Sequence, residues 1–237
     1  MKTALCFTGT CRSLEYTHEN IKRLLIDTTS PDVFLLIADN PHASKARKYF
    51  SGSRIKKLLI EPEPDYDLSA LRFRPGWPPQ TTTTQIYYKM IKSRQRCGEI
   101  LREYERKNNL QYDRVIFSRL DVKYFEEVGP LLDEINLDHL YVPDFHNTFG
   151  RVIDGYNDRF AVSNRKNMQI YFNAVNSADS FVQNGGYITA ETLLKWHLID
   201  AQVNVEHLPV RFTRVRPDGS EIDSRLKDFQ PGDHRDS

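Results

Sequence analysis

Short apolar runs that alternate with amphipathic segments dominate the first part of the sequence. Strand-like runs occupy residues 3–8, 32–38 and 55–60, and segments with helical spacing lie between them at 15–27 and 42–50. Apolar strands that alternate with helices are typical of a parallel sheet covered on both faces. The sequence therefore predicts an α/β fold whose central sheet is mostly parallel and flanked by helices on both faces.

Later segments continue this alternation. The segment at 61–84, rich in proline and threonine, is either a flap over a site or a long connection. A helix is expected at about 85–107 because apolar residues recur on one face, namely Ile86, Met90, Cys97, Leu101 and Tyr104. Pro143 predicts an edge position for a strand at 138–145, because proline cannot donate to a ladder. Further strands are expected around 115–117, 160–163, 203–205 and 210–215, and helices at 165–175 and 189–200.

Composition excludes several classes of function. The chain has 237 residues, with 33 Lys+Arg against 32 Asp+Glu, and neither half is strongly basic. A broad nucleic-acid surface needs a basic footprint, so we expect no nucleic-acid partner. An apolar run of about 18 residues is absent, so we expect no membrane span. Three cysteines without metal-type spacing favour a reducing, cytoplasmic environment.

Polar residues follow two of the predicted strands. Gly9 ends the first strand and Arg12 follows it, so this turn could admit a phosphate that Arg12 binds, although a simple tight turn is the simpler interpretation. Arg119 and Asp121 end the strand around 115–117. Ligands of open α/β sheets bind outside the carboxyl ends of the strands. The pair could therefore hold a phosphate and a metal together, or form a surface salt bridge.

Two later segments carry carboxylates. Residues 154–160 hold two acids, a glycine and an asparagine, which suits sugar hydroxyl groups but also an ordinary turn. Glu191 lies in the first turn of the helix at 189–200, with Thr189 or its neighbour as cap. It is either a residue that favours the helix N-terminus or a general base presented to a cleft. His146 adjoins the first of these segments.

Four stretches in this order resemble the GT-A-type nucleotide-sugar glycosyltransferases. The resemblance is to small enzymes of bacterial surface-polysaccharide synthesis and of large algal viruses, the chloroviruses. The stretches are CFTGTCRSLE, YDRVIFSRLDVKYF, GYNDRFAVSNRKNMQIYFN and ITAETLLKWHLIDAQVNV, the last followed by RFTRVRPDG. The resemblance implies a GT-A-like, Rossmann-like sheet with a smaller mixed region on the acceptor side.

The resemblance also implies how the chain is organised. Residues 1–217 would form one domain, with a nucleotide-sugar-binding half at 1–125 and an acceptor and catalytic half at 126–217. Residues 218–237 would form a polar tail. The activity implied is transfer of a sugar from a UDP-, GDP- or dTDP-sugar to a glycan or other hydroxyl acceptor, in polysaccharide biosynthesis or protein glycosylation.

Site residues follow from the same resemblance. Asp121 would take the place of the acid that holds Mn²⁺ or Mg²⁺ on the diphosphate, but position 119 is arginine, so Arg119 could neutralise a phosphate itself. Glu191 would be the general base of an inverting displacement, with Asp158 in reserve. The remaining donor residues would be Thr8, Gly9, Thr10, Arg12 and Asp39, and the acceptor residues Asp154, Asn157 and His146.

Two other classes of function remain open from the sequence. A non-catalytic module on the same fold would bind a nucleotide or glycan without turning it over. Another Rossmann-like transferase, such as a methyltransferase, is disfavoured because the glycine-rich dinucleotide fingerprint is missing.

Overall fold

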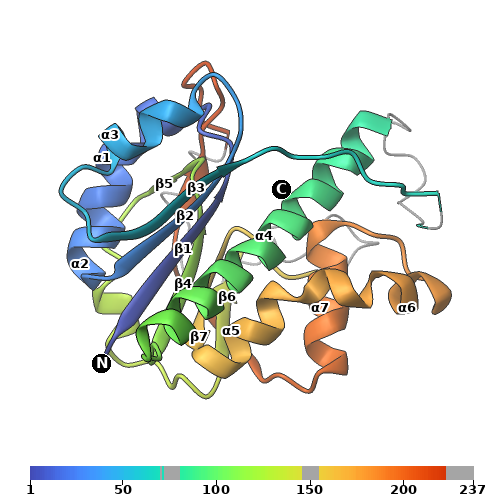
Figure 1. The fold of residues 1–237 in the computed structure, drawn as a ribbon. Coiled ribbons are helices and arrows are strands. Elements are labelled where there is room, and N and C mark those ends of the chain that lie inside the picture. The colour runs from blue at the N-terminus through green and yellow to red at the C-terminus, as the bar shows by residue number, and fades with distance from the viewer. Residues whose placement is uncertain (70, 72–80, 146–154, 223–237) are drawn as a thin grey trace.

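The computed structural model describes residues 1–69, 71, 81–145 and 155–222. Within these residues, a seven-stranded sheet in the order β3-β2-β1-β4-β7-β6-β8 forms the centre of the molecule (Figure 1). Its strands are β1 (Thr3–Gly9), β2 (Asp32–Ala38), β3 (Ile55–Glu61), β4 (Arg114–Arg119), β6 (Leu140–Pro143), β7 (Phe160–Asn164) and β8 (Val205–Leu208). The strands from β3 to β4 in this order are parallel, and β7 is antiparallel to both of its neighbours.

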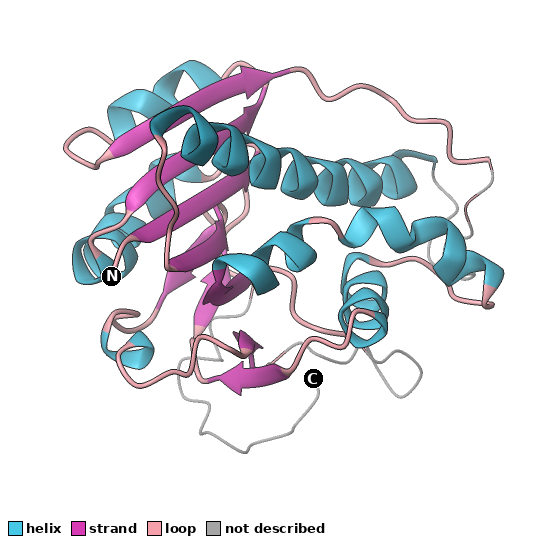
Figure 2. Ribbon diagram, turned by 60° about the horizontal axis from the view of Figure 1, so that its bottom comes forward, coloured by secondary structure: helices cyan, strands magenta, loops and turns pink. Residues whose placement is uncertain are grey.

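Helices cover both faces of this sheet, as the sequence predicts. One face carries α1 (Leu14–Ile21), a π-helical turn (Lys22–Ile26), α2 (Asp27–Thr29), a 3₁₀ turn (Ala43–Lys45) and α3 (Ala46–Tyr49). The other face carries α4 (Thr81–Asn108), α5 (Arg165–Phe172) and α7 (Ala190–Asp200), with a 3₁₀ turn (Ala174–Ser177) and α6 (Ala178–Gln183) beyond them (Figures 1 and 2). The fold class is therefore α/β, with a mostly parallel central sheet.

The central strands β1, β2 and β4 are buried along nearly their whole length, which explains their continuous apolar runs. Leu5 and Phe7 of β1 pack into the core under α1, whereas Ala4 and Cys6 pack into the core under α4. Successive side chains of a strand point to opposite faces, so a strand between two helical layers needs apolar residues at every position. The three cysteines are all buried as free thiols.

A small second sheet extends the structure beside the carboxyl end of β4. It pairs β5 (Val122–Tyr124) with β9 (Phe212–Arg214) in antiparallel fashion, and a 3₁₀ turn (Pro130–Leu132) follows β5. The sequence indicates β9 but not β5 or α6. Among the helices that the structure describes, none combines the length and apolar character needed to cross a bilayer.

Two expectations about packing are wrong. The strand that contains Pro143 is not at the edge, because β6 lies between β7 and β8. Pro143 is the last residue of that strand, so its missing N–H leaves the ladder intact, and Asp144 N donates to Leu208 O just beyond it. Ile86 is 52% exposed, because the N-terminal part of α4 extends past the sheet (Figure 1).

His197 provides a test of how α7 packs against its neighbours. Its ring contacts Ser177 Oγ at 2.6 Å and the Ile170 carbonyl oxygen at 2.9 Å. Burial lowers the pKa of His197 below its ordinary value of 6.5. Below that pH the unfolded chain takes up a proton that the folded chain resists, so the free energy of unfolding falls as the pH falls.

We therefore expect the free energy of unfolding of His197→Gln to fall less steeply between about pH 7.5 and about pH 5.5 than that of the unsubstituted protein. The two slopes should differ by at most about 1.4 kcal/mol per pH unit. Urea unfolding at several pH values measures this slope. The matched control is His42→Gln, which changes an exposed histidine and should leave the slope unchanged. Equal slopes for the His197 variant and the unsubstituted protein would contradict this account of the ring.

Candidate functional site

The carboxyl ends of β1 and β4 lie at one edge of the sheet. The two strands are parallel neighbours in which Thr8 is opposite Arg119, so the segment from Gly9 to Arg12 and the segment ending at Asp121 leave the sheet together. Gly9 has a φ of 123°, which L-residues rarely adopt, so this exit requires glycine. The turn after β1 and the end of β4 therefore lie side by side at one edge of the sheet.

The predicted donor residues of β1 and β2 lie along this edge with different exposures. Thr8 is buried, whereas Arg12 is exposed and its Nε donates to Thr10 Oγ1 at 3.2 Å. Asp39 follows β2 and is exposed, with its backbone N–H donating to the Glu61 carbonyl. Their roles as donor-binding residues stay predictions.

Cys11 lies within the same turn but is buried. Burial raises the pKa of its thiol to about 12, so the reactive thiolate is scarce at neutral pH. This side chain is a packing residue of the turn.

Arg119 and Asp121 form a two-bonded ion pair at the end of β4. Arg119 Nε donates to Asp121 Oδ1 at 2.9 Å and Arg119 Nη2 donates to Oδ2 at 2.6 Å. The two side chains are 22% and 29% exposed, so they lie at the rim rather than in the core. Burial opposes ionisation of Asp121, but the Arg119 guanidinium prevails and lowers the pKa of that carboxyl.

A second charged cluster lies where β7 begins. Because β7 is antiparallel to β4, the residues that precede it lie at the carboxyl end of β4, and Arg119 N donates to Arg159 O at 3.1 Å. Arg159 Nη2 lies 3.3 Å from Glu191 Oε1, and its Nη1 lies 3.9 Å from Asp158 Oδ1. The chain thus places a guanidinium between two carboxylates beside the Arg119–Asp121 pair.

Glu191 reaches this cluster because α7 begins here. Thr189 caps the helix in a reciprocal pair with Thr192, which confirms the predicted cap. Tyr156 N donates to the Glu191 carbonyl at 3.2 Å, and Gly155 packs directly against Glu191. The first turn of α7 therefore holds the segment at 155–160 in place.

Glu191 is only 5% exposed, and its surroundings shift the pKa of its carboxyl group. Burial raises the pKa of Glu191, the neighbouring carboxylate of Asp158 raises it further, and the Arg159 guanidinium opposes both. A carboxylate with a raised pKa is a stronger base, so this position suits proton transfer.

Helix α4 contributes residues that sequence reasoning missed. Arg94 is 2% exposed, lies 4.9 Å from the centre of the Tyr171 ring, and donates from Nη1 to Tyr171 Oη at 3.2 Å. Tyr171 Oη in turn donates to the Asp158 carbonyl at 3.2 Å. Tyr87 lies two turns before Arg94 on the same helix, and burial raises the pKa of its hydroxyl, with a further increase from the carboxylate of Glu191. The sequence could have indicated Arg94, because it lies three positions before Cys97 and so on the buried face of α4.

The predicted acceptor residues are only partly described. Asn157 is buried, donating from Nδ2 to the Phe145 carbonyl at 2.9 Å and accepting from Arg159 N at 3.1 Å. Its amide therefore shapes the loop that carries Asp158 and Arg159. His146 and Asp154 lie outside the described residues.

A divalent metal would find few ligands here on its own. Among the described residues, no group of three or more His, Cys, Asp or Glu side chains is arranged to hold an ion. Asp121 offers one carboxylate, and both of its oxygens accept from Arg119. Mn²⁺ or Mg²⁺ at Asp121 therefore fits only when a bound molecule supplies further oxygen ligands.

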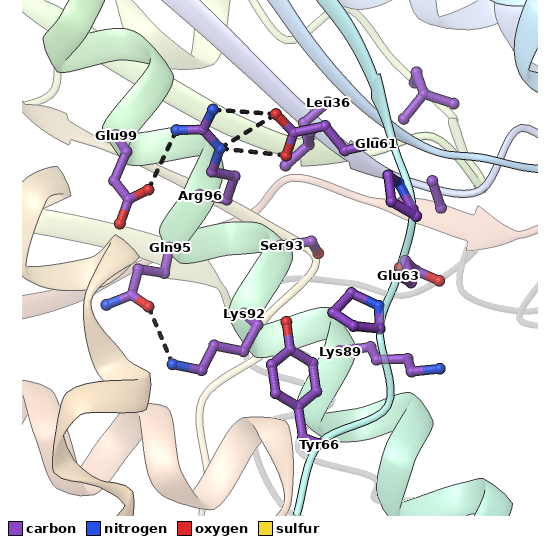
Figure 3. Close-up of a pocket in the computed structure, with 15 residues that line it drawn as sticks. Leu36, Glu61, Glu63, Tyr66, Lys89, Lys92, Ser93, Gln95, Arg96 and Glu99 are labelled. Carbon is purple, nitrogen blue, oxygen red and sulfur yellow. Dashed lines mark hydrogen bonds and ion pairs between the residues drawn. The ribbon is translucent and has the colours of Figure 1, made fainter.

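A pocket of about 280 Å³ lies beside this edge, at the carboxyl ends of β1, β2 and β3 (Figure 3). Gly9, Ala38 and Glu61 line it from the strands, and Tyr66 lines it from the segment that follows β3. Helix α4 closes it with Lys89, Lys92 and Arg96. Arg96 Nε and Nη2 both donate to the Glu61 carboxylate, at 3.1 to 3.3 Å, so an ion pair joins α4 to the end of β3 along this wall. The pocket and the charged cluster share Gly9 and α4 as neighbours.

Comparison with known proteins gives a family match. A family model described as Domain of unknown function (DUF7796) matches residues 1–217. No curated protein matches the sequence. Among solved structures, the apo-form glycosyltransferase GlyE of Streptococcus pneumoniae TIGR4 is similar, with a TM-score of 0.47 and 15% identity over 87% of this chain and 45% of that chain. This chain therefore spans less than half the length of that protein.

Gly155 tests the packing that assembles the charged cluster. A Cβ at this position would lie 2.7 Å from Glu191 Cβ and 2.8 Å from the Glu191 carbonyl carbon. Because that backbone cannot give way cheaply, we expect Gly155→Ala to lower the free energy of unfolding by about 1–3 kcal/mol. Chemical denaturation measures the change, and a variant as stable as the unsubstituted protein would show that the loop and α7 are not packed this closely.

Proposed function

The chain belongs to the family described as Domain of unknown function (DUF7796), and we propose that it transfers a sugar from a nucleoside-diphosphate sugar to a hydroxyl group of a glycan or other acceptor. One observation carries the proposal. A pocket, a rim pair of guanidinium and carboxylate, and a buried carboxylate with a raised pKa follow one another along the carboxyl edge of the sheet. Ligands of open α/β sheets bind at this edge.

The pocket suits the nucleoside of such a donor. Tyr66 offers an aromatic ring, Glu61 and Arg96 offer fixed polar groups, and Gly9 leaves room for close approach to the backbone. Arg12 is exposed where β1 leaves the sheet. Its guanidinium would bind the diphosphate there, because guanidinium groups pair with phosphate through two parallel hydrogen bonds.

Charge at the end of β4 suits the departure of the nucleoside diphosphate. In the transfer, an acceptor oxygen bonds to the anomeric carbon of the sugar while the bond from that carbon to the diphosphate oxygen breaks. The diphosphate leaves with the bonding electrons, and positive charge from Arg119 would stabilise it. Glu191 would take the proton of the acceptor hydroxyl, giving inversion at the anomeric carbon, and Asp158 is the reserve base.

A divalent cation forms part of this proposal. Asp121 would hold Mn²⁺ or Mg²⁺ together with diphosphate oxygens, and the ion would supply further positive charge against the leaving group. Asn157 shapes the acceptor side, for which Asp154 and His146 are also proposed. We place the reaction in the cytoplasm, where reducing conditions keep buried thiols free.

A binding module without catalysis is the second candidate. It is favoured by the burial of both candidate bases, since Asp158 is 4% and Glu191 5% exposed and both lie near Arg159. Such a module would bind the same sugar nucleotides and form no product.

Donor binding is the first test of the proposal. A ligand that binds only the folded protein stabilises it by about 2.7 kcal/mol at one hundred times its dissociation constant, so we expect a UDP-, GDP- or dTDP-sugar to raise the melting temperature. Arg12→Gln should weaken that donor about 10-fold to 100-fold, the loss expected for one charge-assisted contact. The control is Arg54→Gln, which removes an exposed guanidinium paired with Asp32 at the opposite edge. The proposal fails if none of these nucleotides changes the melting temperature.

The proposed base has its own test. With the donor identified, we expect Glu191→Gln to lower kcat by about 10²-fold to 10⁴-fold while the donor dissociation constant stays nearly constant. Glu19→Gln, an exposed change in α1, serves as the control and should leave kcat unchanged. Unreduced turnover in the Glu191 variant would transfer the role to another group, and donor binding without product in the unsubstituted protein would favour the binding module.

A further inference from the structure

Arg119 and Asp121 are bonded to each other, and this affects the diphosphate proposed for Arg119 and the cation proposed for Asp121. We propose that Arg119 occupies Asp121 until a diphosphate draws the guanidinium away, so that a divalent cation and a nucleoside diphosphate bind cooperatively. This inference rests on the proposed function, and it assigns to the pair a regulation of the same site.

A cation alone meets two obstacles at Asp121. Divalent ions such as Mn²⁺ prefer carboxylate oxygens, but both oxygens of Asp121 already accept hydrogen bonds from Arg119, at 2.9 and 2.6 Å. Arg159 adds a second positive charge near the same carboxylate. The ion would have to break a two-bonded pair while approaching two guanidinium groups, so its affinity for the empty protein should be low.

A diphosphate removes the first obstacle. Guanidinium binds phosphate with the same two-bonded geometry as carboxylate, so Arg119 loses little when it exchanges one for the other. The exit of β1 brings Gly9 to the same edge, opposite the end of β4. Once Arg119 has turned to the diphosphate, the Asp121 oxygens and the phosphate oxygens face a common space that carries negative charge.

The backbone around the pair is hydrogen-bonded to other segments of the chain, whereas the paired side chains lie partly exposed at the rim. Arg119 N donates to Arg159 O at 3.1 Å, the Leu120 carbonyl accepts from Thr17 Oγ1 at 2.7 Å, and the Asp121 carbonyl accepts from Val215 N at 2.8 Å. The side chains of Arg119 and Asp121 are 22% and 29% exposed. The exchange therefore needs only a rotation of side chains at the rim.

Linkage makes this inference quantitative. If the diphosphate raises the affinity for the cation, the cation must raise the affinity for the diphosphate by the same factor, and such factors are typically about 5-fold to 150-fold. We expect a factor in this range for the unsubstituted protein.

The experiment measures Mn²⁺ binding by the loss of the electron paramagnetic resonance signal of free Mn²⁺, with and without saturating UDP, GDP or dTDP. The signal is corrected for the complex that Mn²⁺ forms with the nucleotide in buffer. Isothermal titration calorimetry gives the reciprocal quantity, the nucleotide dissociation constant with and without Mn²⁺. The expected result is weak binding of Mn²⁺ alone and a matching increase of both affinities when both ligands are present.

Two variants separate the pair from its surroundings. Arg119→Gln frees Asp121, so Mn²⁺ should bind this variant without nucleotide several-fold more tightly than it binds the unsubstituted protein. The coupling factor should fall, and the part that remains is due to the diphosphate oxygens that ligate the ion. Arg54→Gln removes the same charge at the opposite edge of the sheet and should leave the coupling factor unchanged.

Each result decides between the inference and the function beneath it. Tight Mn²⁺ binding to the protein without nucleotide overturns the inference, and the proposed function then stands. Nucleotide binding that Mn²⁺ leaves unchanged also overturns the inference and removes the cation from the proposed function, whereas sugar transfer itself stands. Failure of every nucleoside diphosphate to bind, with or without Mn²⁺, overturns the proposed function as well. The measurements on the unsubstituted protein decide the matter even if Arg119→Gln does not fold.

Discussion

The antiparallel pairing of β7 with β4 determines which groups meet at the carboxyl edge of this sheet. A parallel strand in that place would carry its preceding residues to the opposite edge, far from Arg119. Because β7 runs the other way, Asp158 and Arg159 arrive beside the end of β4, and the backbone bond from Arg119 N to Arg159 O joins the two segments. Helix α7 then needs only its first turn to bring Glu191 to them.

The buried charged groups at this edge lower the stability of the fold. Burying ionised groups costs several kcal/mol each, and mutual attraction offsets this only when the remaining hydrogen bonds are made. Within the described part of the chain, Asp158 Oδ1 and Arg159 Nε are buried without a hydrogen-bond partner. A cluster that leaves such atoms unsatisfied is poor evidence of a stabilising network. Perturbed carboxylates beside a pocket are more typical of a functional site.

Sequence reasoning succeeds where burial alone determines the pattern. The continuous apolar runs of β1 and β2 follow directly from a strand that lies between two helical layers, and the Thr189 cap follows from local hydrogen bonding. It fails where partners are distant, because β5 is three residues long and is defined by pairing with β9 some way along the chain. The burial of Arg94 is not predicted for a different reason. A helical face is recognised by its apolar residues, and Arg94 is a charged residue that packs on the Tyr171 ring.

Helix α4 ties the pocket to the charged cluster more firmly than any loop could. Its middle packs against β1 and β2 through Cys97 and Leu101, while Lys89 and Lys92 line the pocket. From the same helix, Arg94 supports Tyr171, which bonds the carbonyl of Asp158. Groups on a rigid element hold their relative positions better than groups on loops. Movement of one end of α4 would disturb the core beneath its middle. One continuous helix therefore fixes the distance between a ligand bound at the lysines and the carboxylates of the cluster.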